Sequence, residues 1–395
     1  MLIRIMRNFN YYNPTRIQFG WGRINEIGKI VKRNGKKCLL VTVEPFPAME
    51  PLFEKVKQIS QEAGVEIIHY DGAIPEPTDE CVDTGSEIAK ENKVEIILGL
   101  GGGSSIDTAK AIAVGATHEG DVWDYRLGQK QIDSKKILPI IAVPTTGGTG
   151  AEVTNMAVIK SAKDKFKSAL ANWDLTPRVA LVDPELTLTV PPQITASTGF
   201  DAFTHSFETF INSNSSDFID LYALRAMKNV IKYLPIAIEN GQNKEAREAL
   251  SFAATLGGLC ISNIGTTLAH GIAMALGGHS SGISHGEGLA ILYPEVNRWT
   301  WKHAIEKYAA VGRLFNHDLK NNSEEEAAEK CCNEIESFLG KIGLWISLED
   351  KNVSRKDIGA IADDTLNLRN YTLHPRLANS KAVVRIIEKS FRRDI

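Results

Sequence analysis

The stretch LGGGSSIDTAK, residues 100–110, joins an apolar run to a segment rich in helix-forming residues. Three consecutive glycines allow a backbone to approach a ligand closely. The helix expected to start near Ser105 would direct its free N–H groups and the positive end of its dipole at this loop. The stretch therefore predicts a strand, a phosphate-binding loop and a helix. Its spacing is not GxGxxG, and taken alone it also fits a plain tight turn.

Strands and helices alternate on both sides of this loop. The patterns predict strands at 37–43, 65–70, 94–100, 137–143 and 179–183, and helices at 51–63 and 80–91. Alternation of this kind favours a parallel sheet with helices on its faces. We expect an α/β N-terminal domain built on a parallel sheet.

The pattern changes after about Pro192. Helical periodicity covers 200–211, 221–233, 244–261 and 302–315, and the β-branched runs disappear. A chain of 395 residues is long enough for two domains. We therefore predict an α/β domain of residues 1–190 and an all-α domain of residues 191–395.

Composition excludes several classes of partner. The net charge of −3 gives no reason to expect nucleic acid or an anionic membrane surface. No run approaches the ~18 apolar residues of a membrane span, and the N-terminus does not read as a secretory signal. The five cysteines are odd in number and lack CxxC spacing, which argues against a disulfide framework and a cysteine zinc site. We expect a cytoplasmic protein.

A second loop, PTTGGTGAEVT at residues 144–154, also follows a predicted strand. Its threonines and glycines supply hydroxyl groups and open backbone for a polar or phosphorylated ligand. Alone it is also an ordinary turn. Two such loops at the ends of neighbouring strands favour a cofactor cleft.

Candidate metal ligands lie in the helical half. Asp201 and His205 are four residues apart on a predicted helix and share one face. His270 and His285 follow in other segments. Three imidazoles and one carboxylate suit a divalent transition metal, and without a thiolate iron and zinc both remain open. Spacing alone does not establish that the four converge, and each histidine also fits an ordinary structural role.

Together, residues 101–110, 144–154, 199–205 and 270–294 resemble the signatures of iron-containing (group III) alcohol dehydrogenases, in the branch of lactaldehyde reductase, 1,3-propanediol dehydrogenase and butanol dehydrogenase. The similarity extends along nearly the whole chain. It implies the dehydroquinate synthase-like, iron-dependent alcohol dehydrogenase fold, with a Rossmann-like dinucleotide-binding domain at residues 1–190 and a helical metal-binding and catalytic domain at residues 191–395. It also implies Fe²⁺ (or Zn²⁺) and NAD or NADP as cofactors. The resemblance implies metal ligation by Asp201, His205, His270 and His285. It implies cofactor contacts from Gly102, Gly103, Ser104, Asp107, Thr145, Thr146, Thr149, Thr154, Asn155 and Lys167.

The sequence departs from the family pattern in three places. Val43 stands where many members carry an acid that favours NAD, so NADP stays open. Met274 replaces a histidine of many relatives, and a thioether carries no proton. One extra residue falls between His270 and His285, in a segment that contains His279. Two routes for the proton remain open: through His279, or through water and the ribose hydroxyls.

The resulting hypothesis is a metal-dependent NAD(P)-linked dehydrogenase that interconverts a small alcohol or diol and its aldehyde by hydride transfer. We expect a homodimer or a larger homo-oligomer. The alternatives are a glycerol dehydrogenase-like polyol oxidoreductase, a hydroxyacid–oxoacid transhydrogenase, a dehydroquinate synthase-like lyase and a non-catalytic binding protein. The lyase requires a basic cluster that is absent near the ligand motifs, and the full ligand set argues against the glycerol enzyme and the binding protein.

Overall fold

The structure is a computed structural model that describes residues 7–280 and 282–393. The chain forms two compact units: Asn13–Val190, and Pro191–Ile395 together with the N-terminal residues up to Tyr12. Phe9 and Tyr11 pack against Phe218, with ring centroids 5.3 Å and 4.8 Å apart. These aromatic contacts join the first described residues to the helical unit, whereas the sequence analysis placed them with the α/β unit.

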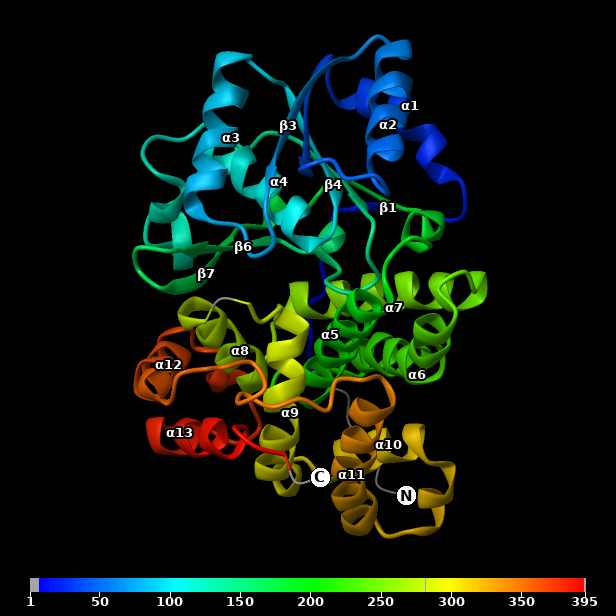
Figure 1. The fold of residues 1–395 in the computed structure, drawn as a ribbon, viewed down its shortest axis with the longest axis vertical. Helices are drawn as coiled ribbons and strands as arrows, with labels where there is room; N and C mark the ends of the chain where they lie inside the picture. The colour runs from blue at the N-terminus through cyan, green and yellow to red at the C-terminus, as the bar shows by residue number, and fades with distance from the viewer. Residues whose placement is uncertain (1–6, 281, 394–395) are drawn as a thin grey trace. The chain divides into compact units, whose positions relative to one another are not determined.

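The α/β unit is built on a sheet of six strands in the order β1-β8-β5-β4-β2-β3, and every pair in it is parallel. Figure 1 labels β1, β3 and β4 of this sheet. The strands are β1 (Arg16–Phe19), β2 (Lys37–Val43), β3 (Glu66–Ala73), β4 (Ile96–Gly101), β5 (Ile140–Pro144) and β8 (Val179–Val182). From β2 the chain continues to β3 on one side and then to β4 on the other. Such a switch point is where parallel sheets bind ligands, beyond the carboxyl ends of the strands.

Four helices cover the two faces of this sheet: α1 (Ile27–Asn34), α2 (Glu50–Glu62), α3 (Asp79–Glu91) and α4 (Gly103–Gly115). Successive residues of a strand point to opposite faces. Leu40 accordingly belongs to the core formed with α1 and α2, and Leu39 to the core formed with α3 and α4. The predicted parallel sheet with helices on both faces is confirmed.

The unit also contains a two-stranded antiparallel hairpin, β6 (Met156–Ser161) and β7 (Phe166–Ala171). The sequence analysis missed this hairpin, as well as β1 and α1. All of these elements are short, and their apolar patterns are correspondingly weak.

The second unit is helical throughout the part that the structure describes. Its helices are α5 (Pro192–Ile211), α6 (Asp217–Glu239), α7 (Lys244–Ile264), α8 (Leu268–His279), α9 (His285–Thr300), α10 (Ile305–Phe315), α11 (Glu324–Lys341), α12 (Ile358–Asn367) and α13 (Ser380–Lys389). Among the described residues, no single helix is long and apolar enough to cross a membrane. The pair α7 and α8 passes that test together, but the two are bent by 96° at their junction.

Candidate active site

Helix α5 has two chemically distinct faces. Phe200, Phe203 and Phe207 pack around the ring of Tyr293, with centroids 5.4 to 6.4 Å apart. Another face carries Asp201 and His205, which are buried. Because the aromatic side chains fill the core, α5 is fixed in rotation, and its polar face is held in one direction.

Two further helices bring histidines to this polar face. The sharp bend between α7 and α8 places His270 in the first turn of α8. His285 is the first residue of α9, directly after the cap residue Ser284. At the next position, a Cβ atom on Gly286 would lie 2.1 Å from the backbone oxygen of Ser197 in α5. Only glycine permits this approach, which sets the distance between His285 and α5.

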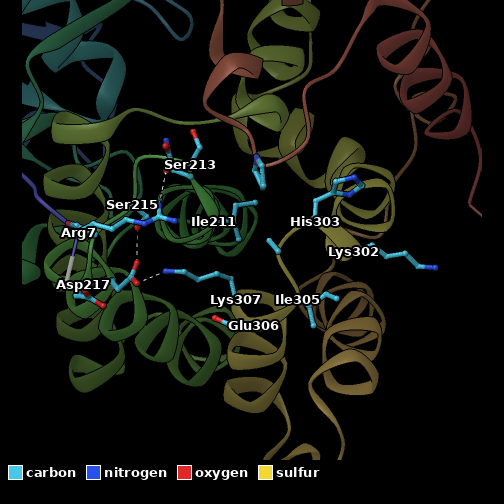
Figure 2. Close-up of a pocket in the computed structure, with 15 residues that line it drawn as sticks. Arg7, Ile211, Ser213, Ser215, Asp217, Lys302, His303, Ile305, Glu306 and Lys307 are labelled. Atoms are coloured by element: carbon cyan, nitrogen blue, oxygen red, sulfur yellow. Dashed lines mark hydrogen bonds and ion pairs between the residues drawn. The ribbon is translucent and has the colours of Figure 1, made fainter. Parts of the chain in front are cut away.

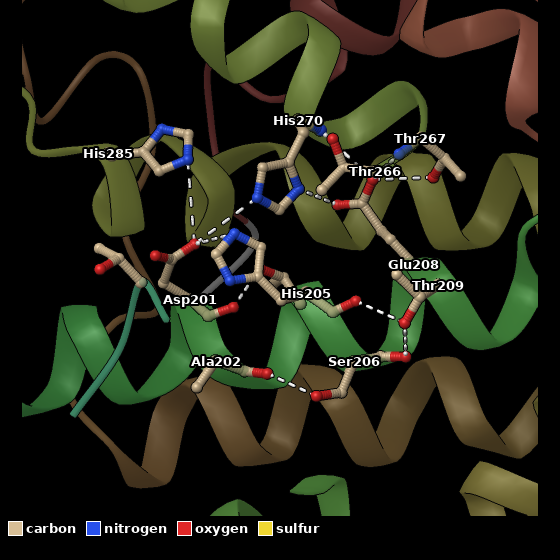
Figure 3. Close-up of polar contacts among 12 residues, drawn as sticks. Asp201, Ala202, His205, Ser206, Glu208, Thr209, Thr266, Thr267, His270 and His285 are labelled. Carbon is tan, nitrogen blue, oxygen red and sulfur yellow. Dashed lines mark hydrogen bonds and ion pairs between the residues drawn. The ribbon is translucent and has the colours of Figure 1, made fainter. Parts of the chain in front are cut away.

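The four predicted ligands lie together, and the three histidines point at one carboxylate oxygen of Asp201 (Figure 3). The Nε2 atoms of His205, His270 and His285 lie 3.5, 3.6 and 3.8 Å from Oδ1 of Asp201. Donor atoms of Asp201, His270 and His285 all lie within 4.8 Å of one another. Ligands about 2.1 Å from one tetrahedral ion are roughly 3.4 Å apart, so the spacing fits a shared metal ion.

Two polar atoms at the centre of the cluster, Oδ1 of Asp201 and Nε2 of His270, are buried and have no hydrogen-bond partner among the described residues. Unsatisfied buried polar atoms are costly and call for a ligand. The donor set, one carboxylate and three imidazoles, matches what iron and zinc accept. The residues present therefore fit a divalent metal ion.

The charges in the cluster are strongly coupled. Burial opposes ionisation of Asp201, but the three histidines outweigh it and hold its pKa well below the usual range. Burial lowers the pKa of His205 to about 4. Burial also disfavours protonated His270, but the carboxylates of Glu208 and Asp201 outweigh this and raise its pKa to about 9. The anionic surroundings favour a cation at this point.

Glu208 is a buried carboxylate in contact with the cluster that was not predicted from the sequence. Its Oε1 atom lies 2.6 Å from Nδ1 of His270, and its Oε2 atom accepts hydrogen bonds from the backbone N–H and hydroxyl of Thr267. A carboxylate at Nδ1 keeps the proton there and leaves the Nε2 lone pair for a metal. Glu208 follows Asp201 and His205 at positions i+7 and i+3 of one helix, a spacing that could have revealed it.

The structure does not bring His279 to the cluster. Its Nε2 atom lies 2.7 Å from Oδ2 of Asp364 in α12. His279 is nine residues beyond His270 on α8, which places it about 13 Å along the helix and on the opposite face. Met274, four residues after His270, shares the His270 face and is half-buried. Met274, rather than His279, is the near neighbour of the cluster on this helix.

In the α/β unit, the two predicted cofactor loops lie side by side. They follow the adjacent strands β4 and β5, and the N–H of Thr145 donates to the carbonyl of Gly101 at 2.9 Å. A Cβ atom on Gly103 would lie 2.6 Å from Cγ2 of Thr149. Gly101 has φ +149°, and Gly102 caps α4 without a side-chain hydrogen bond. The loops thus present a helix N-terminus and threonine hydroxyls together, as a phosphate site requires.

The remaining predicted cofactor residues gather behind these loops. Oδ2 of Asp107 accepts from the N–H of Val158 at 3.1 Å, and burial raises the Asp107 pKa to about 6. Lys167 is buried and forms an ion pair with Glu76. Without the family resemblance, Lys167 would have been taken for a solvated surface lysine. Oδ1 of Asn155 is buried and has no partner among the described residues, as expected of a group that awaits a ligand.

The helical unit also contains a cavity of about 540 Å³ that is lined by other residues than the metal cluster (Figure 2). Its described lining includes Arg7, Asp217 and Lys307 but none of the four predicted ligands. Lys307 is paired with Asp220, and Arg7 donates to the carbonyl of Ser213. The first contact joins α10 to α6, and the second joins the N-terminal segment to the loop between α5 and α6. The cavity lining therefore carries charges of both signs.

Comparison with known proteins identifies the family. Residues 14–184 match the model of iron-containing alcohol dehydrogenases, and residues 195–391 match the model of the C-terminal part of that family. NAD-dependent methanol dehydrogenase of Bacillus methanolicus is 31% identical over 96% of this chain and 99% of its own. 1,3-Propanediol dehydrogenase of Citrobacter freundii is 33% identical over 98% and 99%. The crystal structure of NADH-dependent butanol dehydrogenase A from Thermotoga maritima has a TM-score of 0.90 at 29% identity, covering 98% and 99%.

The chain belongs to the iron-containing alcohol dehydrogenase family, and the resemblance stated from its motifs is confirmed. The fold class expected from that resemblance is confirmed as well. Membership makes the chain an oxidoreductase that acts on alcohols and aldehydes.

Proposed function

We propose that the protein interconverts a small primary alcohol or diol and its aldehyde with NAD or NADP, using one divalent ion held by Asp201, His205, His270 and His285. The observation that carries this assignment is the convergence of three imidazole Nε2 atoms within 3.8 Å of Oδ1 of Asp201. A bound iron or zinc ion supplies Lewis-acid chemistry to the alcohol oxygen.

The protein's own groups bind the cofactor and orient the metal ligands. Backbone N–H groups of Gly103 and Ser104, at the start of α4, hold the cofactor pyrophosphate. Glu208 keeps His270 in the tautomer that exposes its Nε2 lone pair. Met274 contributes an apolar wall beside the ligands and excludes water there. Three relatives are named for short uncharged alcohols, methanol, 1,3-propanediol and butanol, and these names support such substrates. Other relatives are named for long-chain alcohols and for choline, so the screen of substrates includes both.

One assay tests the proposal. Protein reconstituted with Fe²⁺ or Zn²⁺ is mixed with butanol or 1,3-propanediol and with NAD or NADP, and absorbance is followed at the reduced-nicotinamide band. We expect metal-dependent reduction of the cofactor, and aldehyde-dependent oxidation in reverse. Absence of turnover with every alcohol and both cofactors would remove the proposal.

We further infer a cytoplasmic location and a homodimer or larger homo-oligomer. All five cysteines are free, which suits a reducing compartment. Phe9, Tyr12 and Leu221 are large apolar side chains exposed on the helical unit, which suits an interface between copies. Light scattering on the purified protein measures its mass directly, and a monomer would contradict the second inference.

A further inference from the structure

Lys110 is a fully buried lysine that no part of the proposed chemistry uses. It lies on α4, two turns after the glycine loop, and its side chain is 0% exposed. Its ammonium group donates to the backbone oxygen of Thr154 at 2.9 Å, to Oγ1 of Thr154 at 2.8 Å and to the backbone oxygen of Met156 at 2.9 Å. All three protons of the ammonium group are therefore used within the protein.

These acceptors flank one residue. Thr154 and Met156 are the neighbours of Asn155, so Lys110 fixes the backbone on both sides of it. The carbonyl of Asn155 accepts from the N–H of Asn172, which holds the intervening peptide as well. The side chain of Asn155 is the part left for a ligand, since its Oδ1 atom is buried and has no partner among the described residues.

The charge of Lys110 strengthens this arrangement. Burial lowers its pKa to about 8, against the opposing influence of Asp107 and Glu152, so it is mostly protonated at pH 7. Oδ1 of Asp107 lies 3.8 Å from the ammonium group. Hydrogen bonds from a charged donor in a dry interior are stronger than neutral ones. Removing a charge from water costs free energy, so a buried lysine is expected to serve a role other than stability.

We propose that Lys110 is a positioning residue of the cofactor site, which clamps the segment Thr154–Met156 onto α4 and thereby presents the amide of Asn155 to the nicotinamide dinucleotide. The inference rests on the proposed function, because it takes the two loops as the cofactor site. Lys110 itself does not touch the cofactor. It acts through Asn155, and this makes the effects of the two residues interdependent.

A double-mutant cycle tests the inference on metal-loaded protein, with NADH and NADPH binding followed by cofactor fluorescence. Lys110→Met keeps the length of the side chain and removes its donors, and Asn155→Ala removes the amide. We expect each to weaken cofactor binding by about 10-fold or more, the worth of one or two lost polar contacts. The double variant should bind no more weakly than Lys110→Met alone, within about threefold. Metal content and the KM for alcohol should stay at the wild-type value.

Ile112→Ala is the matched control, because Ile112 is fully buried on the same helix but belongs to the apolar core. It should lower the melting temperature and leave cofactor affinity within about twofold, since its contacts are apolar and distant from the loops. If Lys110→Met does not fold, Lys110→Gln keeps a polar donor at this position and should weaken binding about threefold.

Three results would overturn the inference: wild-type affinity in Lys110→Met, an equal loss in Ile112→Ala, or losses that multiply in the double variant. If the wild-type protein binds neither NADH nor NADPH, the proposed function fails first and takes this inference with it. The two failures are therefore distinguishable.

Discussion

Nδ1 of His270 lies 2.6 Å from Oε1 of Glu208, and both side chains are almost completely buried. This contact fixes the orientation of the ring, and it directs Nε2 toward Asp201 at 3.6 Å. The ligand and its supporting carboxylate come from different helices, α8 and α5, so the contact also joins the two.

Replacing Glu208 with Gln should weaken metal binding. Glutamine keeps the shape but loses the charge that makes His270 a stronger donor, and loss of such a partner costs about 10- to 100-fold in metal affinity. Competition with a chromogenic chelator measures the change. Glu336→Gln, which removes a surface pair with Arg298, is the control and should bind metal normally. Equal affinity in both variants would contradict the role of Glu208.

Replacing His270 with Ala should lower metal content and activity together. Elemental analysis of reconstituted wild-type protein should give about one ion per chain, as a single site of this kind requires. The variant loses one of the donors around Oδ1 of Asp201. Full occupancy and full turnover in the variant would remove His270 from the ligand set.

Replacing Val43 with Asp should shift cofactor preference toward NAD. Val43 ends β2, which pairs with β4, so it lies near the glycine loop. Valine neither accepts from a ribose hydroxyl nor repels a 2′-phosphate, whereas Asp does both. The shift should be roughly 1–3 kcal/mol, the scale of a charge-assisted hydrogen bond. Kinetics with NAD and NADP measure it, and Val43→Asn is the uncharged control.

A wild-type enzyme already strictly specific for NAD would contradict this account. In that case the exposed Glu44, the next residue, would be performing the discrimination.

Replacing His279 with Ala should leave kcat nearly unchanged. The ring is paired with Asp364 and lies far along α8 from His270, so a role as proton relay would require that pair to break. A positioned acid–base group is worth about 10²–10⁴-fold, so the two outcomes are easily separated by pH-dependent kinetics. A loss of that size with constant metal content would restore the histidine route. Retained activity would favour the route through water and ribose hydroxyls.

His374 should make the helical unit sensitive to acid. Burial lowers its pKa to about 4, and its Nε2 lies 2.8 Å from Oγ1 of Thr300. Between pH 6.5 and pH 4 the unfolded chain binds a proton at this site and the folded chain does not, so stability falls as pH falls. Protonation of His374 accounts for a loss of roughly 3 kcal/mol in the free energy of unfolding.

Comparison with His374→Gln isolates the contribution of His374 to this pH dependence. Urea unfolding at pH 7 and pH 4.5 should show a smaller loss of stability for the variant than for the wild type. His317→Gln, at an exposed histidine, should behave like the wild type. Parallel losses in all three proteins would contradict the assignment.

Much of the fold followed from local pattern. The strand predicted at 37–43 is β2, and the helix predicted at 80–91 differs from α3 by one residue. The start of α5 was misplaced by eight residues, since the predicted helix began at residue 200 and α5 begins at Pro192. Thr195, Ser197 and Thr198 have low helix propensity, and tertiary packing overrides it, since the backbone of Ser197 forms the close contact with Gly286.

The candidate site was predictable only in part, because it too depends on tertiary contacts. Residue types and the i, i+4 spacing indicated Asp201 and His205, but no pattern reports convergence between helices. Glu208 and Lys110 are charged residues, and charged residues usually face solvent. Their burial depends on partners distant in the chain, 62 residues away for His270 and 44 for Thr154. Contacts of this range leave no local signature, and the only local sign of Glu208 is the helical spacing that places it on the face of Asp201 and His205.

The close approach of Gly286 to Ser197 has a consequence for how relatives of this protein are sorted. The ligand His285 depends on a neighbour with no side chain, because any Cβ at that position would force α9 away from α5. A chain that keeps all four ligands but carries a larger residue at this position would pass every inspection of its ligand motif and still be unable to assemble the centre. Glycine at this position should therefore be required, together with the four ligands, when a relative is classified as able to bind the metal.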